Sequence, residues 1–209
     1  VNSTIRPGRS SMAKPEAVTD LNSIYETALE QTDWTGLKGD AVTITEIRDR
    51  GFVVLRIRQS TEGAAAALAK LGIELPGAQG MTGAADSKLV KWISPDEYLI
   101  TLPLTEKDAF IAEATAAFAG IFSAVVDNSG AYSLLELSGA HYPDMLSKLT
   151  FYDIRNNLPA GKAVSTLMTK SPVIFYRLSD DSLYCMLRWS FADYALKIMG
   201  KAAEEYNGK

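Results

Sequence analysis

Apolar and polar residues are distributed irregularly at the start of the chain and follow regular periods later. Residues 1 to about 20 are rich in Ser, Pro and charge and show no apolar period, which predicts an arm that does not fold by itself. Apolar residues then recur at helical spacing over residues 21–29, which predicts a short helix. We therefore treat residues 1–38 as an N-terminal arm with a short helix.

Between residues 39 and 120, segments of alternating polarity are interspersed with helix-forming runs. The alternation predicts strands at 41–47, 52–57, 88–93 and 98–102, and helices at 61–71 and 106–118. The turn residues Asp49-Arg50-Gly51 indicate that the first two strands form a hairpin, and Thr105 is placed to cap the second helix.

The remaining residues, 121–209, restate this pattern. Strands are expected at 122–126, 132–137, 164–169, 173–177 and 183–188, and helices at 140–149 and 191–206. Ser190 is expected to cap the last helix. The pattern predicts an α+β fold of two interlocked subdomains, 39–120 and 121–209, with mixed or antiparallel sheets and helices packed on one face. A weak internal repeat with a boundary near Gly120 is consistent with it.

Composition narrows the class of protein. A chain of 209 residues with 47% apolar residues can bury a substantial core, and its apolar stretches are too short to span a bilayer. The formal charge of −4 is mixed along the chain, which argues against nucleic-acid binding. Cys185 is the only cysteine, and the first residues lack the apolar run of a secretory signal, so we expect a cytoplasmic protein.

The single histidine is the first candidate for catalysis. His141 precedes Asp144 by three residues in a predicted helix, so the two side chains could meet on one face. Ser138 and Ser147 lie nearby but do not complete a triad. We interpret the pair as the solvated start of a helix.

Neither Cys185 nor the glycines of residues 77–83 have the context of a reactive site. Cys185 lies at an interior strand position between Leu183 and Leu187, which is typical of a small buried residue rather than a reactive thiol. The glycines do not follow a strand and open a helix, so no nucleotide cradle is predicted.

Carboxylates are the remaining candidates for acid–base chemistry, and four of them, Asp127, Glu136, Asp144 and Asp153, stand out in the second half. Asp127 ends a strand before Asn128-Ser129-Gly130, where a side chain more commonly accepts hydrogen bonds from turn amides. We assign no catalytic, cofactor-binding or metal-binding residue to this chain.

Several aromatic residues are expected in the core. Any of them that prove exposed would instead mark an interface with another subunit. They are Trp34, Trp92, Trp189, Phe191 and Tyr194.

An ordered set of short motifs gives a more specific indication than any single residue. The motifs are Trp92 to Leu99, Val126-Asp127-Asn128-Ser129, Leu135 to Gly139, Leu149 to Ile154 with Leu158-Pro159-Ala160-Gly161, and Ser190 to Tyr194. From about residue 40 to the end, this set resembles the gamma subunit family of heterotetrameric sarcosine oxidase. The chain departs from the family at Tyr132-Ser133, where an arginine is frequent, and at Leu149-Thr150, where Gly-Cys is frequent.

The resemblance implies a fold like that of the folate-binding aminomethyltransferases, such as the glycine cleavage T-protein. It implies a non-catalytic subunit, without activity alone, that supports assembly with alpha, beta and delta subunits. Those partners would carry FAD, FMN, NAD, tetrahydrofolate and zinc, with none bound by this chain, and the complex would oxidatively demethylate sarcosine to glycine in sarcosine catabolism and one-carbon metabolism. An assembly subunit should expose a large apolar patch when isolated.

Three alternatives remain open on sequence grounds. The departures from the family pattern are compatible with a subunit of a related N-methyl amino acid dehydrogenase. A stand-alone folate-binding aminomethyltransferase-like protein would need a deep pocket with convergent polar groups. A general adaptor would have neither flavoprotein partners nor such a pocket.

Overall fold

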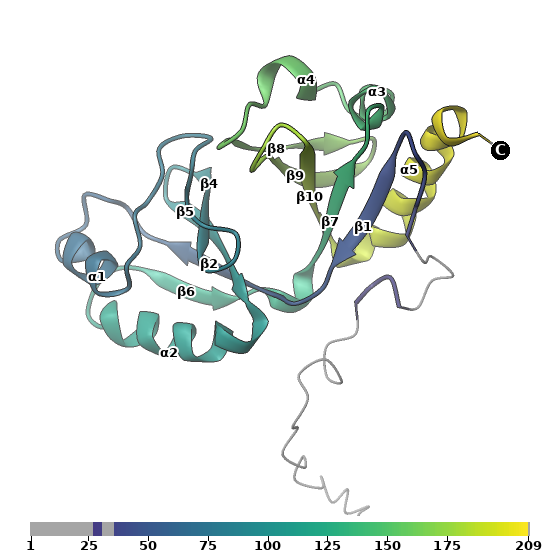
Figure 1. Cartoon of the computed structure of the whole chain (residues 1–209). Coiled ribbons are helices and arrows are strands. Elements are labelled where there is room, and N and C mark those ends of the chain that lie inside the picture. The colour runs from purple at the N-terminus through teal and green to yellow at the C-terminus, as the bar shows by residue number, and fades with distance from the viewer. Residues whose placement is uncertain (1–26, 31–35, 209) are drawn as a thin grey trace, which may run out of the picture.

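Two five-stranded antiparallel sheets form the centre of the molecule, with helices on their outer faces (Figure 1). This computed structural model describes residues 27–30 and 36–208, and the α+β class expected from the sequence is confirmed. Trp34 and most of the expected helix at 21–29 lie outside the described residues, and residues 28–30 form a turn.

The first sheet has the strand order β3-β4-β5-β2-β6. Its strands are β2 (Arg50–Arg56), β3 (Met81–Gly83), β4 (Leu89–Ser94), β5 (Glu97–Pro103) and β6 (Ala124–Asp127). Its outer face is covered by α1 (Ala64–Lys70) and α2 (Lys107–Ala117).

The second sheet has the order β1-β7-β10-β9-β8. Its strands are β1 (Thr43–Ile47), β7 (Tyr132–Ser138), β8 (Ala163–Met168), β9 (Ser171–Tyr176) and β10 (Ser182–Arg188). It is covered by α3 (Tyr142–Ser147), α4 (Ile154–Asn157) and α5 (Ala192–Asn207).

Strand alternation divides the core into three layers. In β2, Val53 and Leu55 face the helices of the first sheet, whereas Phe52 and Val54 face the second sheet. Apolar residues of β7, β9 and β10 complete the layer between the sheets, namely Leu134, Ile174, Tyr176 and Met186. Because both faces of the central strands are buried, these strands read as nearly continuous apolar runs.

The two sheets are joined by one two-stranded ribbon that runs through both of them. β1 leads directly into β2, β6 leads into β7, and β1 pairs with β7 as β2 pairs with β6. The hairpin expected between residues 41–47 and 52–57 is therefore wrong. Local turn residues suggested it, but β1 pairs with β7 about 90 residues away in sequence and β2 pairs with β6 about 70 residues away.

The strand orders of the two sheets match position by position. β4, β5 and α2 correspond to β9, β10 and α5, and β6 occupies the place that β1 has in the second sheet. This supports the internal repeat at the level of topology. β1 comes from the first half of the sequence but lies in the second sheet, and β6 comes from the second half but lies in the first sheet. The proposed boundary between subdomains 39–120 and 121–209 therefore stays a prediction.

Both long helices begin without the expected side-chain caps. A 3₁₀ turn precedes each one, η2 (Leu104–Glu106) before α2 and η4 (Trp189–Phe191) before α5. Thr105 and Ser190 lie inside these turns, so neither is an N-cap. No helix in the described ranges has the length and apolarity to cross a membrane.

Candidate functional site

The turn that follows β6 is bonded to β2 at the point where the ribbon leaves the first sheet for the second. The amide of Ser129 donates to Asp127 Oδ1 (2.9 Å), and the amide of Phe52 donates to Ser129 Oγ (3.0 Å). The amide of Asn128 in turn donates to the carbonyl of Phe52 (2.8 Å). The expected role of Asp127 as an acceptor for a turn amide is confirmed. The residues Asp127-Asn128-Ser129 thus serve to bond the turn to β2.

Asp127 also forms an ion pair that ties β6 to α2. Lys107 Nζ lies 2.5 Å from Asp127 Oδ2 and 3.0 Å from Asp108 Oδ1, and the lysine side chain is almost fully buried. Partial burial raises the pKa of Asp127, but the hydrogen bonds from Lys107 and Ser129 outweigh it and lower the pKa overall. Asp127 is therefore held ionised, which suits a structural carboxylate rather than a general base.

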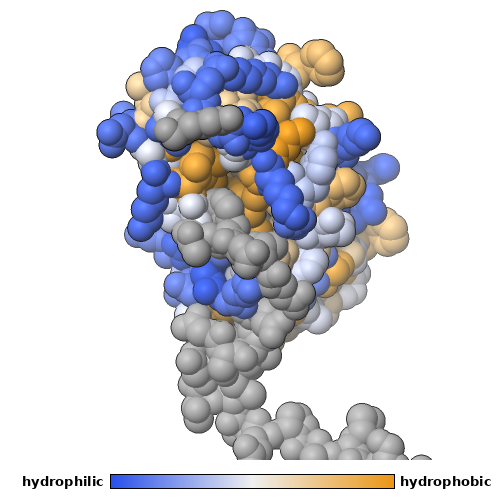
Figure 2. Space-filling view, turned by 90° about the vertical axis from the view of Figure 1, so that its right-hand side faces the viewer, coloured by the Kyte–Doolittle hydropathy of each residue, from blue (hydrophilic) through white to orange (hydrophobic). Residues whose placement is uncertain are grey.

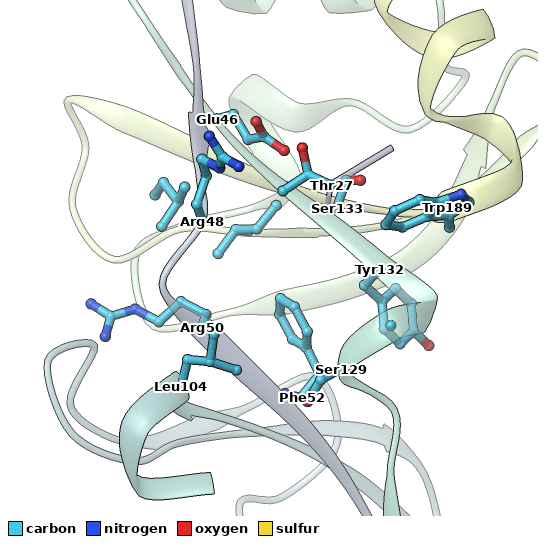
Figure 3. Close-up of a pocket in the computed structure, with 13 residues that line it drawn as sticks. Thr27, Glu46, Arg48, Arg50, Phe52, Leu104, Ser129, Tyr132, Ser133 and Trp189 are labelled. Atoms are coloured by element: carbon cyan, nitrogen blue, oxygen red, sulfur yellow. Dashed lines mark hydrogen bonds between the residues drawn. The ribbon is translucent and has the colours of Figure 1, made fainter. Parts of the chain in front are cut away.

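A small cavity lies beside the crossing, between the end of β1 and the start of β7 (Figure 3). It encloses about 40 Å³ and is lined by Glu46, Arg50, Phe52, Ser133 and Trp189, among others. Ligand pockets typically measure about 300–1,000 Å³, so this space admits water and not a pterin.

Polar groups in this cavity are only partly paired. Ser133 Oγ is buried and has no hydrogen-bond partner among the described residues. The Thr27 hydroxyl is likewise buried without a hydrogen-bond partner among the described residues, and burial raises the pKa of Glu46. A water molecule would satisfy such groups, and the arrangement offers no pair of groups poised for catalysis.

His141 and Asp144 meet as their spacing indicated. His141 Nδ1 lies 3.0 Å from Asp144 Oδ2, and Arg155 Nη2 lies 2.7 Å from the other carboxylate oxygen. These contacts, that of His141 first, lower the pKa of Asp144. His141 is exposed and stacks on Tyr206, so the interpretation as a solvated helix start is confirmed.

The other sequence candidates are dispersed. Cys185 is fully buried, as expected, and burial raises the pKa of its thiol. Asp153 caps α4 by accepting from the amide of Asn156, and Glu136 lies on β7. No hydrogen bond within residues 27–30 and 36–208 joins two of the four candidate carboxylates, and no group of His, Cys, Asp and Glu there is arranged to bind a metal ion.

A buried lysine between the sheets was not anticipated. Lys91 on β4 is fully buried, its Nζ lies 2.7 Å from Thr101 Oγ1, and it stands 4.6 Å from the centre of the Tyr176 ring. Burial lowers the pKa of Lys91 to about 7. The sequence could have indicated this burial, because Leu89 and Ile93, two positions before and after Lys91 on the same face of the strand, are both apolar.

Exposed apolar residues are found in several places. Among the aromatic residues named from the sequence, Trp92 and Phe191 are half-buried, while Trp189 and Tyr194 reach 36% exposure. Two aromatic residues that the sequence did not single out are far more exposed, Phe122 at 93% and Phe151 at 109%. Apolar residues are also exposed between hydrophilic ones on the side of the molecule that carries β1 and α5 (Figure 2).

The fold defined by these two sheets is that of the aminomethyltransferases. A crystal structure of the glycine cleavage system aminomethyltransferase T from Bartonella henselae superposes with a TM-score of 0.58 at 12% identity, covering 77% of this chain and 46% of that one. At this identity the likeness concerns the fold alone.

Sequence comparison identifies the family. The pattern described as "Sarcosine oxidase, gamma subunit family" matches residues 59–205. The sarcosine oxidase subunit gamma of an Arthrobacter species is 32% identical over 173 residues, which cover 82% of this chain and 84% of that protein. A chain in the structure of heterotetrameric sarcosine oxidase from Corynebacterium sp. U-96, in complex with pyrrole 2-carboxylate, superposes with a TM-score of 0.75 at 26% identity, covering 83% of this chain and 89% of that one. The chain belongs to the sarcosine oxidase gamma subunit family.

Proposed function

We propose that this chain is the non-catalytic gamma subunit of a heterotetrameric sarcosine oxidase and acts in the cytoplasm. The observation that carries the proposal is the match to sarcosine oxidase gamma subunits over most of both chains. The site geometry is compatible with it, because the candidate acid–base residues are dispersed over the described part of the chain.

Its partners in this proposal are alpha, beta and delta subunits, which carry FAD, FMN, NAD, tetrahydrofolate and zinc. They oxidatively demethylate sarcosine to glycine. This chain contributes surface: burying an exposed side chain such as Phe122 against a partner contributes about 1.5–3 kcal/mol. The paired sheets and their shared ribbon provide a rigid support for that surface.

The proposal is tested by purifying the tagged full-length chain from its source under native conditions. We expect the eluate to absorb as a flavoprotein and to release hydrogen peroxide when sarcosine is added. A flavin-containing eluate that is inactive on sarcosine but active on another N-methyl amino acid would move the proposal to a related complex. A colourless chain without partners would contradict it, and tetrahydrofolate titration would then test the stand-alone alternative.

A further inference from the structure

The edge strand β6 and the residues before it expose an apolar stripe on one face. Phe122, Ala124 and Val126 occupy alternate positions, and all three are exposed, Phe122 at 93% and Val126 at 47%. Ala124 and Val126 lie on the same face of β6, because side chains two residues apart in a strand share a face, and Phe122 stands two residues before the strand. Val125, between them, packs instead against the core on the helix side. The stripe is thus a continuous apolar face that the described part of the chain leaves uncovered.

The backbone of β6 has a free side as well. The amide of Asn128 bonds to the carbonyl of Phe52, which fixes which residue pairs between β2 and β6 exchange hydrogen bonds. Because such pairs alternate in antiparallel ladders, Ala124 and Val126 bond to β2, whereas the N–H and C=O groups of Val125 and Asp127 point away from the sheet. These groups can accept another strand.

In the second sheet, the equivalent edge is already paired by the chain itself. β1 has the place there that β6 has in the first sheet. Leu37 pairs with Ile44 of β1 through two backbone hydrogen bonds, of 3.1 and 2.8 Å. No comparable segment among the described residues pairs with β6, so the first sheet lacks at this edge the added segment that the second sheet has.

The charge beside the stripe indicates the chemistry of the missing segment. Arg56 and Arg58 line the same surface hollow of about 400 Å³ as Phe122 and Ala124. Arg56 has Asp96 and Glu97 within 3.6 and 3.9 Å, but the guanidinium of Arg58 has no ion-pair partner in the described ranges. A segment laid along β6 would gain from a carboxylate facing Arg58.

We infer that the β6 edge of this chain is a docking strand for another subunit of the complex, which adds an extended segment to the first sheet. The segment carries apolar side chains at alternate positions over Phe122 and Val126, and an acidic side chain against Arg58. The inference rests on the proposed function, and it names the surface through which that function is carried out.

Amide hydrogen exchange on the full chain, free and within the purified complex, tests the backbone pairing. We expect the amides of Val125 and Asp127 to exchange at least about tenfold more slowly in the complex, whereas those of Ala124 and Val126, already bonded to β2, change little. Equal exchange of Val125 and Asp127 in both states would overturn the inference. Slow exchange of the same amides in a dimer of the isolated chain would assign the edge to a second copy instead.

Substitutions test the side chains. Phe122→Ser and Arg58→Glu should each reduce recovery of flavin-containing subunits about tenfold, a change of ~1.4 kcal/mol, whereas Arg58→Lys retains recovery. Phe151→Ser is the matched control and should retain recovery, because Phe151 is also an exposed phenylalanine but lies away from β6, on the loop after α3. The isolated variants should keep the wild-type melting temperature, which separates loss of docking from loss of folding.

The outcomes separate the two proposals. If the wild-type chain recovers flavin-containing subunits and Phe122→Ser does so equally well, the docking strand is wrong and the proposed function stands. If the wild-type chain recovers none, the proposed function fails and the inference that rests on it fails as well.

Discussion

At the residue scale, Lys91 is the group whose environment differs most from its usual one. It is fully buried between the sheets, with Thr101 and the Tyr176 ring as its neighbours and no ion-pair partner in the part of the chain that the structure describes. A buried lysine without a carboxylate resists protonation, and burial lowers its pKa from 10.5 to about 7. Lys91 therefore links the packing of the two sheets to pH.

The sign of this linkage follows from the two pKa values. Between pH 7 and about 10, the unfolded chain keeps a proton on Lys91 that the folded chain releases, so the free energy of unfolding rises with pH. Below pH 7 both the folded and the unfolded chain hold the proton on Lys91. The buried charge then lowers the free energy of unfolding by its full amount. Lys91→Met removes this cost while keeping a side chain of similar length.

We expect Lys91→Met to raise the free energy of unfolding at pH 6 by on the order of 1–3 kcal/mol, and by less at pH 8.5. Urea denaturation of both proteins at the two pH values measures the difference. A difference that is independent of pH would show that Lys91 does not titrate in this range.

At the element scale, the connection from β7 to α3 depends on a glycine that no other residue can replace without strain. Gly139 has φ +101°, and a Cβ built there would lie 2.4 Å from the carbonyl oxygen of Ala41. That same oxygen accepts from the amide of His141 (3.0 Å). The motif Ser138-Gly139 thus fixes the end of β7 against Ala41, which lies two residues before β1.

Gly139→Ala should lower the free energy of unfolding by about 2 kcal/mol or more, because it combines an unfavourable φ with a backbone clash. Gly130→Ala is the control, since its Cβ meets nothing within 4 Å and its φ is not positive. It should change stability by less than about 0.5 kcal/mol. Similar thermal shifts for the two variants would contradict this role of Gly139.

The sequence predicted elements better than it predicted their partners. Alternation located the strands at Leu89–Ser94 and Ser182–Arg188 well, because each has buried apolar residues in a local pattern. It could not show that β1 and β2 belong to different sheets, since that depends on pairing with β7 and β6. Of the candidate residues, Asp127, His141 and Cys185 were interpreted correctly from local context. Phe122 was missed because period-two spacing does not reveal which face of a strand lacks a covering layer.

At the scale of the whole molecule, the two sheets form one unit. The β1–β2 and β6–β7 strands cross between them, and residues of both sheets share the core layer that includes Phe52, Leu99, Leu134 and Met186. Either sheet alone would expose the inner faces of its strands. The molecule should therefore lose both sheets together.

We expect a single unfolding transition in urea, with coincident curves from far-ultraviolet circular dichroism and from tryptophan fluorescence. Trp92 lies on β4 of the first sheet, and Trp189 follows β10 of the second, so fluorescence responds to both. Two separated transitions would show that the halves are independent and that the shared ribbon does not couple them.

The central claim is that the chain functions as a subunit and not alone, and native mass spectrometry tests it most directly. The sample is the assembly purified through the tagged full-length chain from its source. The account predicts a species of four different chains in which this 22.7 kDa chain occurs once, together with flavin. A spectrum containing only the 22.7 kDa chain, or multiples of it, would contradict the account.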